Sequence, residues 1–133
     1  KLSVLWPSTT ARVDDWNTNS LVMRLEYGKF TALLMGDGNK DTEIGLLKNQ
    51  ADLRANIIKV GHHAASDCCT AEFISSVKAE VFVISVNKEN ANGYPDKNVV
   101  NSLEKAGKVL LTSDFGTIVV KAEQDGSFKI SKP

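Results

Sequence analysis

Two apolar runs, each ending in a glycine followed by residues that can bind metals, decide how this sequence is expected to fold. The first is Phe30-Thr31-Ala32-Leu33-Leu34-Met35, which continues into Gly36-Asp37-Gly38. The second is Ile57-Ile58-Lys59-Val60-Gly61, which continues into the only histidines of the chain, His62-His63. Short apolar runs are typical of buried strands, and the loops beyond strand ends commonly carry the functional site. A carboxylate and an imidazole at one rim suit zinc or manganese, so Asp37, His62 and His63 are candidate ligands.

A metal centre needs more donors than these residues supply. A structural zinc takes about four protein ligands, and a catalytic zinc takes about three and a water. The chain has no second histidine cluster. The alternative interpretation is that Gly36-Asp37 forms a turn or a helix cap and that His62-His63 are surface polar residues.

Length and composition indicate one globular domain. The chain has 133 residues, of which 42% are hydrophobic and 24% charged. Its formal net charge is zero, so no overall basic field exists to hold nucleic acid, and any contact with DNA must be local. No apolar stretch approaches the ~20 residues of a membrane helix, and the first residues lack the pattern of a signal peptide. The sequence therefore predicts a soluble domain.

The only cysteines, Cys68 and Cys69, are adjacent. Sequence neighbours seldom reach the geometry of an internal disulfide, so both are predicted to be free thiols, which favours a reducing compartment. Their spacing from the histidines matches no recognised zinc pattern, and a pair at a helix entry is the simpler interpretation.

Strand and helix patterns alternate along the chain. Strands are predicted at 2–6, 20–27, 29–35, 56–61, 81–86, 109–112, 117–121 and 128–130, and helices at 41–50, 70–77 and 97–105. The strands on either side of Gly28 predict a hairpin, residues 8–19 a loop, and residues 114–116 a turn. The pattern predicts an α/β (α+β) fold in a single domain over residues 1–133.

An ordered set of short motifs resembles a known family. The set is Asn19-Ser20-Leu21-Val22, Gly36-Asp37, Glu43, Lys59-Val60-Gly61-His62-His63, Val83-Ile84-Ser85-Val86, Asn90, Pro95 and Thr112-Ser113-Asp114-Phe115-Gly116. It resembles the metallo-β-lactamase-fold domain of ComEC-type competence proteins and its free-standing hydrolase relatives. The resemblance extends from about Val4 to Val120.

The resemblance implies a fold and a site. The family fold is a four-layer αββα sandwich of two halves, and this chain resembles the C-terminal half, a mixed β-sheet with helices on one face. The family's His-x-His-x-Asp-His loop belongs to the N-terminal half and is absent here. By resemblance, Asp37 would bridge two metals, zinc or manganese, and one of His62 and His63 would complete the second metal's shell. The sequence does not decide which of the two histidines is the ligand.

The function implied is metal-assisted hydrolysis of a phosphodiester, with DNA as the partner during competence and DNA uptake. Ser66 and Tyr94 are the substrate-binding candidates. Where relatives have His-His-Gly-Ser, this chain has Ala64-Ala65 after the histidines, and Tyr94 replaces a histidine of a Gly-His-Pro element. Tyr94 could hydrogen-bond a phosphate oxygen or be an ordinary loop aromatic.

The isolated chain is expected to bind metal weakly and to hydrolyse nothing, because it holds at most two of the family's ligands. The N-terminal half of the same domain, or a second copy of the chain, is expected to cover the exposed sheet face. A non-catalytic module that binds DNA or protein through a degenerate site is the alternative function, and a receiver-like doubly wound domain is the last-ranked alternative fold. The sequence leaves open whether the parent is a bacterial membrane protein or a secreted protein.

Overall fold

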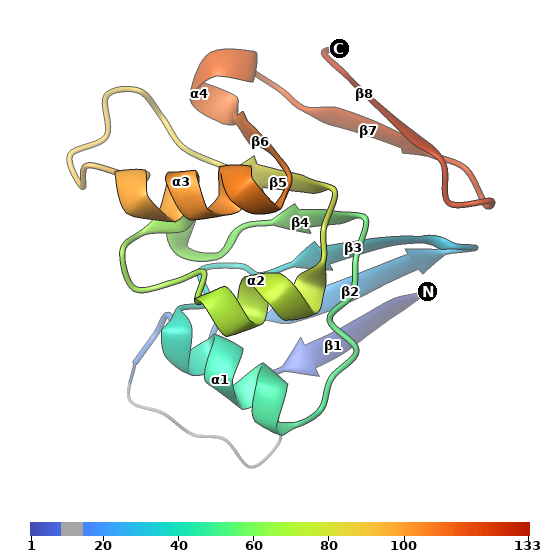
Figure 1. Cartoon of the computed structure of the whole chain (residues 1–133), viewed down its shortest axis with the longest axis horizontal. Coiled ribbons are helices and arrows are strands. Elements are labelled where there is room, and N and C mark those ends of the chain that lie inside the picture. The colour runs from blue at the N-terminus through green and yellow to red at the C-terminus, as the bar shows by residue number, and fades with distance from the viewer. Residues whose placement is uncertain (9–14) are drawn as a thin grey trace.

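The computed structural model describes residues 1–8 and 15–133 (Figure 1). The loop predicted at residues 8–19 therefore lies partly outside the described residues. Among them, no helix is both long enough and apolar enough to cross a membrane.

The centre of the structure is a mixed six-stranded sheet whose strands follow one another in chain order. Its strands are β1 (Leu2–Trp6), β2 (Val22–Tyr27), β3 (Phe30–Leu34), β4 (Ile57–Lys59), β5 (Val81–Ile84) and β6 (Lys108–Leu111). The first three pair antiparallel, and β3 to β6 pair parallel. The predicted hairpin at Gly28 is confirmed, and its antiparallel strands exclude the all-parallel receiver-like alternative.

Three helices cover one face of this sheet (Figure 1). They are α1 (Lys40–Lys48), α2 (Ala71–Val77) and α3 (Lys97–Ala106). Each begins after a side chain that accepts backbone N–H bonds at its N-terminus, namely Asn39, Thr70 and Asp96. Their apolar faces and alternate strand residues form the main core. The largest fully buried side chains of this core include Phe82, Leu33, Leu46 and Leu103. The predicted α+β class, with a mixed sheet and helices, is confirmed.

The opposite face carries a second, smaller hairpin. Strands β7 (Val119–Ala122) and β8 (Phe128–Ser131) pair with each other and form a separate sheet. Side chains of this hairpin pack on a second apolar cluster of Phe30, Ile57, Val81 and Leu110. The hairpin covers part of the sheet face that was expected to be exposed. The predicted turn at 114–116 is wrong in part, since residues Thr112–Phe115 form the short helix α4.

The parallel strands bring their carboxyl ends to one rim, which positions the candidate site. The chain segments after β3 and β4 touch there, because a side chain at Gly61 would collide with the carbonyl oxygen of Gly38. Glycine at this position therefore allows Asp37 and the histidine pair to lie on adjacent loops.

Candidate functional site

Asp37 lies just beyond the end of β3. Gly36 precedes it with a φ of +56°, a left-handed conformation that glycine adopts without strain. The Asp37 backbone N–H donates to the Ser20 hydroxyl at 3.2 Å, and this bond ties the turn to the segment before β2. The carboxylate is 49% exposed, so it is fixed at its base and accessible at its oxygens.

The histidine pair follows β4 in a short 3₁₀ turn, Gly61–Ala64. His62, His63 and Ala64 have φ values of 42°, 52° and 59°. Left-handed backbone costs a residue with a side chain on the order of 1 kcal/mol or more, so such a run persists only where its surroundings hold it. Two backbone bonds do so here: Ala65 N–H donates to His62 C=O at 2.9 Å, and Asp96 N–H donates to Ala64 C=O at 2.8 Å.

His63 is the imidazole that faces Asp37. Its Nε2 lies 3.4 Å from Asp37 Oδ1, and its side chain is 39% exposed. Its Nδ1 lies 2.6 Å from the Ser85 carbonyl oxygen at the end of β5. A carbonyl can only accept, so Nδ1 carries the proton, and in the neutral ring the Nε2 lone pair points toward Asp37.

His62 is held by other protein groups. Its Nδ1 lies 2.9 Å from Asp67 Oδ1, and its Nε2 lies 3.2 Å from the Asn17 amide nitrogen. The side chain is only 17% exposed. Of the two histidines that sequence left open, the geometry therefore pairs His63 with Asp37 and gives His62 protein partners at both nitrogens.

Tyr94 lies over both imidazoles. Its ring is nearly parallel to that of His63, with centroids 6.0 Å apart and planes 13° apart, and it meets His62 edge-on. Asn90 fixes the Tyr94 loop, because its side chain accepts the Tyr94 N–H and donates to the Tyr94 C=O, both at 2.8 Å. Tyr94 thus lies beside the histidine pair, and its predicted role in substrate binding stays a prediction.

A polar pocket of about 350 Å³ opens beside His63. It is lined by His63, Ser85, Val86, Asn87, Asn90, Asn92, Tyr94 and Thr112. Ser66, the other substrate-binding candidate, is exposed in the turn after Ala65 and is not part of this lining. The exposed Asn87 and Asn92 side-chain amides in the pocket supply donors of the kind that a phosphate or nucleotide needs.

Lys59 is a site residue that the sequence analysis missed as a functional group. Its Nζ lies 3.8 Å from Asp37 Oδ1 and donates to the Gly36 carbonyl. Burial lowers the pKa of Lys59, and the Asp37 carboxylate opposes that shift. The period-2 alternation of β4 places this ammonium on the face opposite the helices, which is the signal that could have found it.

The sequence analysis did not single out the two residues that hold the His62 imidazole, Asp67 and Asn17. Asp67 follows the histidines on the same loop, whereas Asn17 comes from the loop before β2. That loop is fastened by the Asp15 carboxylate, which accepts from Thr18 N–H, from the Thr18 hydroxyl and from the Asn39 amide. The hydrogen bonds from Thr18 hold the pKa of Asp15 below its ordinary value.

The Asp37–His63 pair has the spacing of two ligands on one cation. With bonds of about 2.1 Å to nitrogen and oxygen, donors at a tetrahedral zinc lie about 3.4 Å apart. Asp37 Oδ1 and His63 Nε2 are separated by this distance. In residues 1–8 and 15–133, however, no group of three or more His, Cys, Asp or Glu side chains could hold a metal. The described residues therefore supply two donors, fewer than a catalytic zinc uses.

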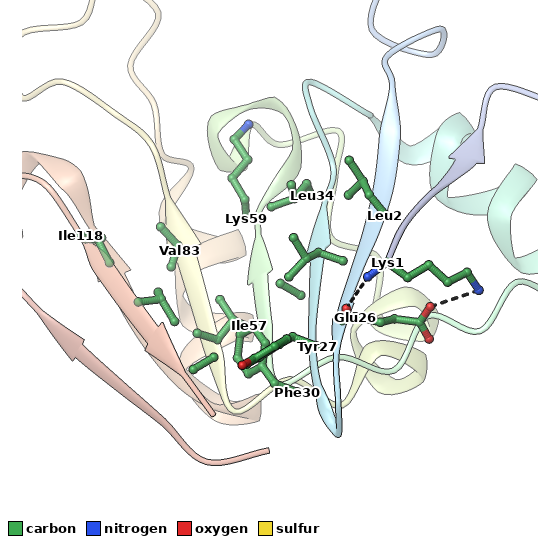
Figure 2. Close-up of a pocket in the computed structure, with 14 residues that line it drawn as sticks. Lys1, Leu2, Glu26, Tyr27, Phe30, Leu34, Ile57, Lys59, Val83 and Ile118 are labelled. Carbon is green, nitrogen blue, oxygen red and sulfur yellow. Dashed lines mark hydrogen bonds and ion pairs between the residues drawn. The ribbon is translucent and has the colours of Figure 1, made fainter. Parts of the chain in front are cut away.

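An open apolar groove extends from this rim over the sheet face that the hairpin leaves uncovered. Figure 2 shows Lys59 at one end of the groove, and Leu34, Ile57 and Phe30 along its floor. Ile118 borders it from the hairpin side, and its volume is about 700 Å³. Leu2, Leu25, Tyr27 and Val120 are exposed large apolar residues that line it.

Comparison with known proteins gives three relatives, and no protein-family model matches the chain. ComE operon protein 3 of Bacillus subtilis is 30% identical over 119 residues, or 88% of this chain. Competence protein ComA of Neisseria gonorrhoeae is 31% identical over 112 residues, or 84% of the chain. The chain is a homologue of competence-related proteins. Recombination protein 2 of Haemophilus influenzae, 26% identical over 110 residues, is a more distant relative.

The similarity covers a small part of each of these three proteins. The chain spans 15% of ComE operon protein 3, 16% of ComA and 14% of Recombination protein 2. The match includes more than four-fifths of this chain in every case.

Proposed function

We propose that this chain is part of a competence-related protein that acts on DNA during uptake, and that its rim contributes ligands to a metal-dependent phosphodiester hydrolase. The names of the relatives support the first part. One observation carries the second: Asp37 Oδ1 and His63 Nε2 converge to 3.4 Å at the carboxyl ends of the parallel strands.

The residues of the rim would have distinct roles. Asp37 and His63 would be the metal ligands, with Asp37 shared between two cations. The Ser85 carbonyl fixes the His63 tautomer, as partners of metal-binding histidines do. When bound, a pair of zinc or manganese ions would supply an activated water and neutralise charge on the phosphate. Tyr94 and the amides of the adjacent pocket would bind the substrate phosphate or nucleotide.

The remaining ligands would come from a partner that covers the open groove. The groove is apolar along the sheet and ends at Lys59, whose ammonium lies 3.8 Å from Asp37, so whatever covers the groove would also come close to the rim. The N-terminal half of the same domain, carrying a His-x-His-x-Asp-His loop, is the proposed occupant, because it would bring metal ligands to this rim. A second copy of the chain would cover the groove without adding that loop, because the sequence contains no histidines other than His62 and His63.

The test uses the chain extended upstream far enough to include a complete sandwich. We expect about two metals per chain and phosphodiesterase activity that Asp37→Asn and His63→Ala each abolish. Asp41→Asn, which removes an exposed carboxylate from α1, is the matched control and should retain activity. The isolated 133-residue chain should be inactive. Hydrolysis by the isolated chain, or an extended chain that keeps full activity without Asp37, would overturn the proposal.

A non-catalytic module that binds DNA or protein is the second candidate, and Lys59 favours it. An ammonium 3.8 Å from Asp37 already balances the charge that a metal would neutralise. The same extended chain separates the two functions: an absence of bound metal and of hydrolysis, together with retained DNA binding, would support the binding module.

A further inference from the structure

The two adjacent cysteines are in contact. Cys68 and Cys69 are free thiols whose Sγ atoms lie 3.2 Å apart. Cys68 is buried, and its Sγ lies 3.2 Å from the Ala65 carbonyl oxygen and 3.4 Å from that of Gly61. The sequence predicted two free thiols, and the structure adds that their sulfur atoms are in contact.

The backbone holds this arrangement. Cys69 has a φ of +62°, in the left-handed region that residues with side chains seldom adopt. The buried Glu43 carboxylate of α1 accepts the N–H groups of Cys69 and Thr70, one on each oxygen. Thr70 in turn caps α2 by accepting the Phe73 N–H. The conformation that brings the thiols together is therefore fixed at both ends.

Cys69 is also reachable from solvent. It is partly exposed and lines an open cleft of about 500 Å³ between α2 and α3. Lys78 and Lys105 line the same cleft, which favours small molecules with negative charge. Cys68 lies behind Cys69 and is buried.

We propose that Cys68 and Cys69 form a modification site, a vicinal dithiol that is oxidised by an anionic low-molecular-weight disulfide entering this cleft. The Cys69 thiolate attacks one sulfur of the small disulfide, which forms a mixed disulfide and releases one small thiol. Cys68 then loses its proton and attacks the Cys69 sulfur, which releases the second small thiol and closes the Cys68–Cys69 bond. Two protein thiols are oxidised and one small disulfide is reduced to two thiols.

The closed form is easily reduced. The thiols must approach from 3.2 Å to the ~2.05 Å of a disulfide. Neighbouring Cα atoms lie about 3.8 Å apart, below the usual range of about 4.4 to 6.8 Å for bridged cysteines. A strained bond of this kind has a high reduction potential, so the modification is reversible by ordinary thiols.

The experiment treats the native chain with oxidised glutathione and measures its intact mass. The hydrogen bond that the Cys69 thiol shares with Cys68, together with burial, raises the pKa of the Cys69 thiol, so the reaction is followed over hours at mildly alkaline pH. Wild-type protein should lose two hydrogens without retaining glutathione, and dithiothreitol should restore them. Cys68→Ser should retain one glutathione, because the mixed disulfide at Cys69 cannot close. Cys69→Ser should acquire none while folded, because Cys68 is buried.

Circular dichroism of both serine variants establishes that they are folded before the masses are compared. Wild-type protein that accumulates stable glutathione adducts or disulfide-linked dimers would overturn the proposal. So would wild-type thiols that stay fully alkylatable after the treatment, or a Cys69→Ser variant that is modified as fast as Cys68→Ser.

Discussion

Glu43 is the buried carboxylate that joins α1 to the cysteine segment, and its removal should destabilise the domain strongly. The side chain is 1% exposed, and each oxygen accepts one backbone N–H, from Cys69 and from Thr70. In Glu43→Ala both N–H groups lose their acceptor in the interior. An unsatisfied buried donor costs about 1–3 kcal/mol, so we expect a loss of roughly 2–5 kcal/mol of unfolding free energy.

Glu43→Gln separates the two hydrogen bonds. Its single carbonyl oxygen can accept one N–H, and its amide group then faces the other donor, so the expected loss is about half that of Glu43→Ala. Urea unfolding followed by circular dichroism at pH 7 measures both variants, with Glu104→Ala as the exposed glutamate control on α3. A Glu43→Ala protein that is less than about 1 kcal/mol below wild type in unfolding free energy would contradict this explanation, because so small a loss is less than the cost of one unsatisfied donor.

The difference in unfolding free energy between wild type and Glu43→Gln should depend on pH. Burial raises the pKa of Glu43 above its ordinary value of 4.5, with Cys69 and Thr70 N–H groups opposing the shift. A raised native pKa contributes stability that is fully present below the unfolded pKa and is lost as pH rises through the native one. The stability difference between wild type and Glu43→Gln should therefore be larger near pH 4 than at pH 7. A difference that grows toward pH 7 would contradict the burial argument.

Three further predictions concern other parts of the molecule. Lys59→Met removes the ammonium beside Asp37 and should raise zinc affinity about tenfold by calorimetry, whereas an unchanged affinity would mean that this charge does not compete with the metal. Gly45→Ala should lower the unfolding free energy by about 1–3 kcal/mol, since the added Cβ would collide with the Trp6 ring. A higher melting temperature would show that the ring can move and that the better helix propensity of alanine outweighs the collision. The pKa of Asp15 is lowered in the folded protein from its ordinary value of 3.8, so wild type should lose stability as the pH falls below 3.8 and through the native pKa. The advantage in unfolding free energy over Asp15→Asn should vanish below the native pKa. An advantage that persists in acid would show that the Asp15 carboxylate is not the source of this stability.

Local pattern was sufficient for most of the secondary structure. The apolar run at β5 and the stripe of Val99, Val100 and Leu103 predicted a buried strand and the helix α3 where they occur. The short element at Thr112–Phe115 was missed because four residues carry no periodicity that separates a turn from a helix. The packing of the β7–β8 hairpin on the sheet also escaped prediction, since it depends on contacts with strands far away in the chain.

The sequence likewise predicted some features of the candidate site and not others. Strand ends and glycines in the sequence were enough to expect Asp37 and the histidine pair at one rim, because parallel strands end together. They could not distinguish His62 from His63, which are neighbours with the same side chain. That choice depends on Ser85, Asp67 and Asn17, whose positions relative to the imidazoles exist only in the folded chain.

Three features could be predicted from the amino-acid sequence, namely the alternation of strands and helices, the mixed α+β class and the ligand-type residues at two strand ends. These follow from periodicity and from residues that act locally in the chain. The folded chain was needed to show that His63 faces Asp37, that Lys59 also contacts that carboxylate, and that the Cys68 and Cys69 thiols touch. Left-handed backbone at His63 and Cys69, together with hydrogen bonds from distant segments, sets these side-chain directions, and no local pattern encodes either feature.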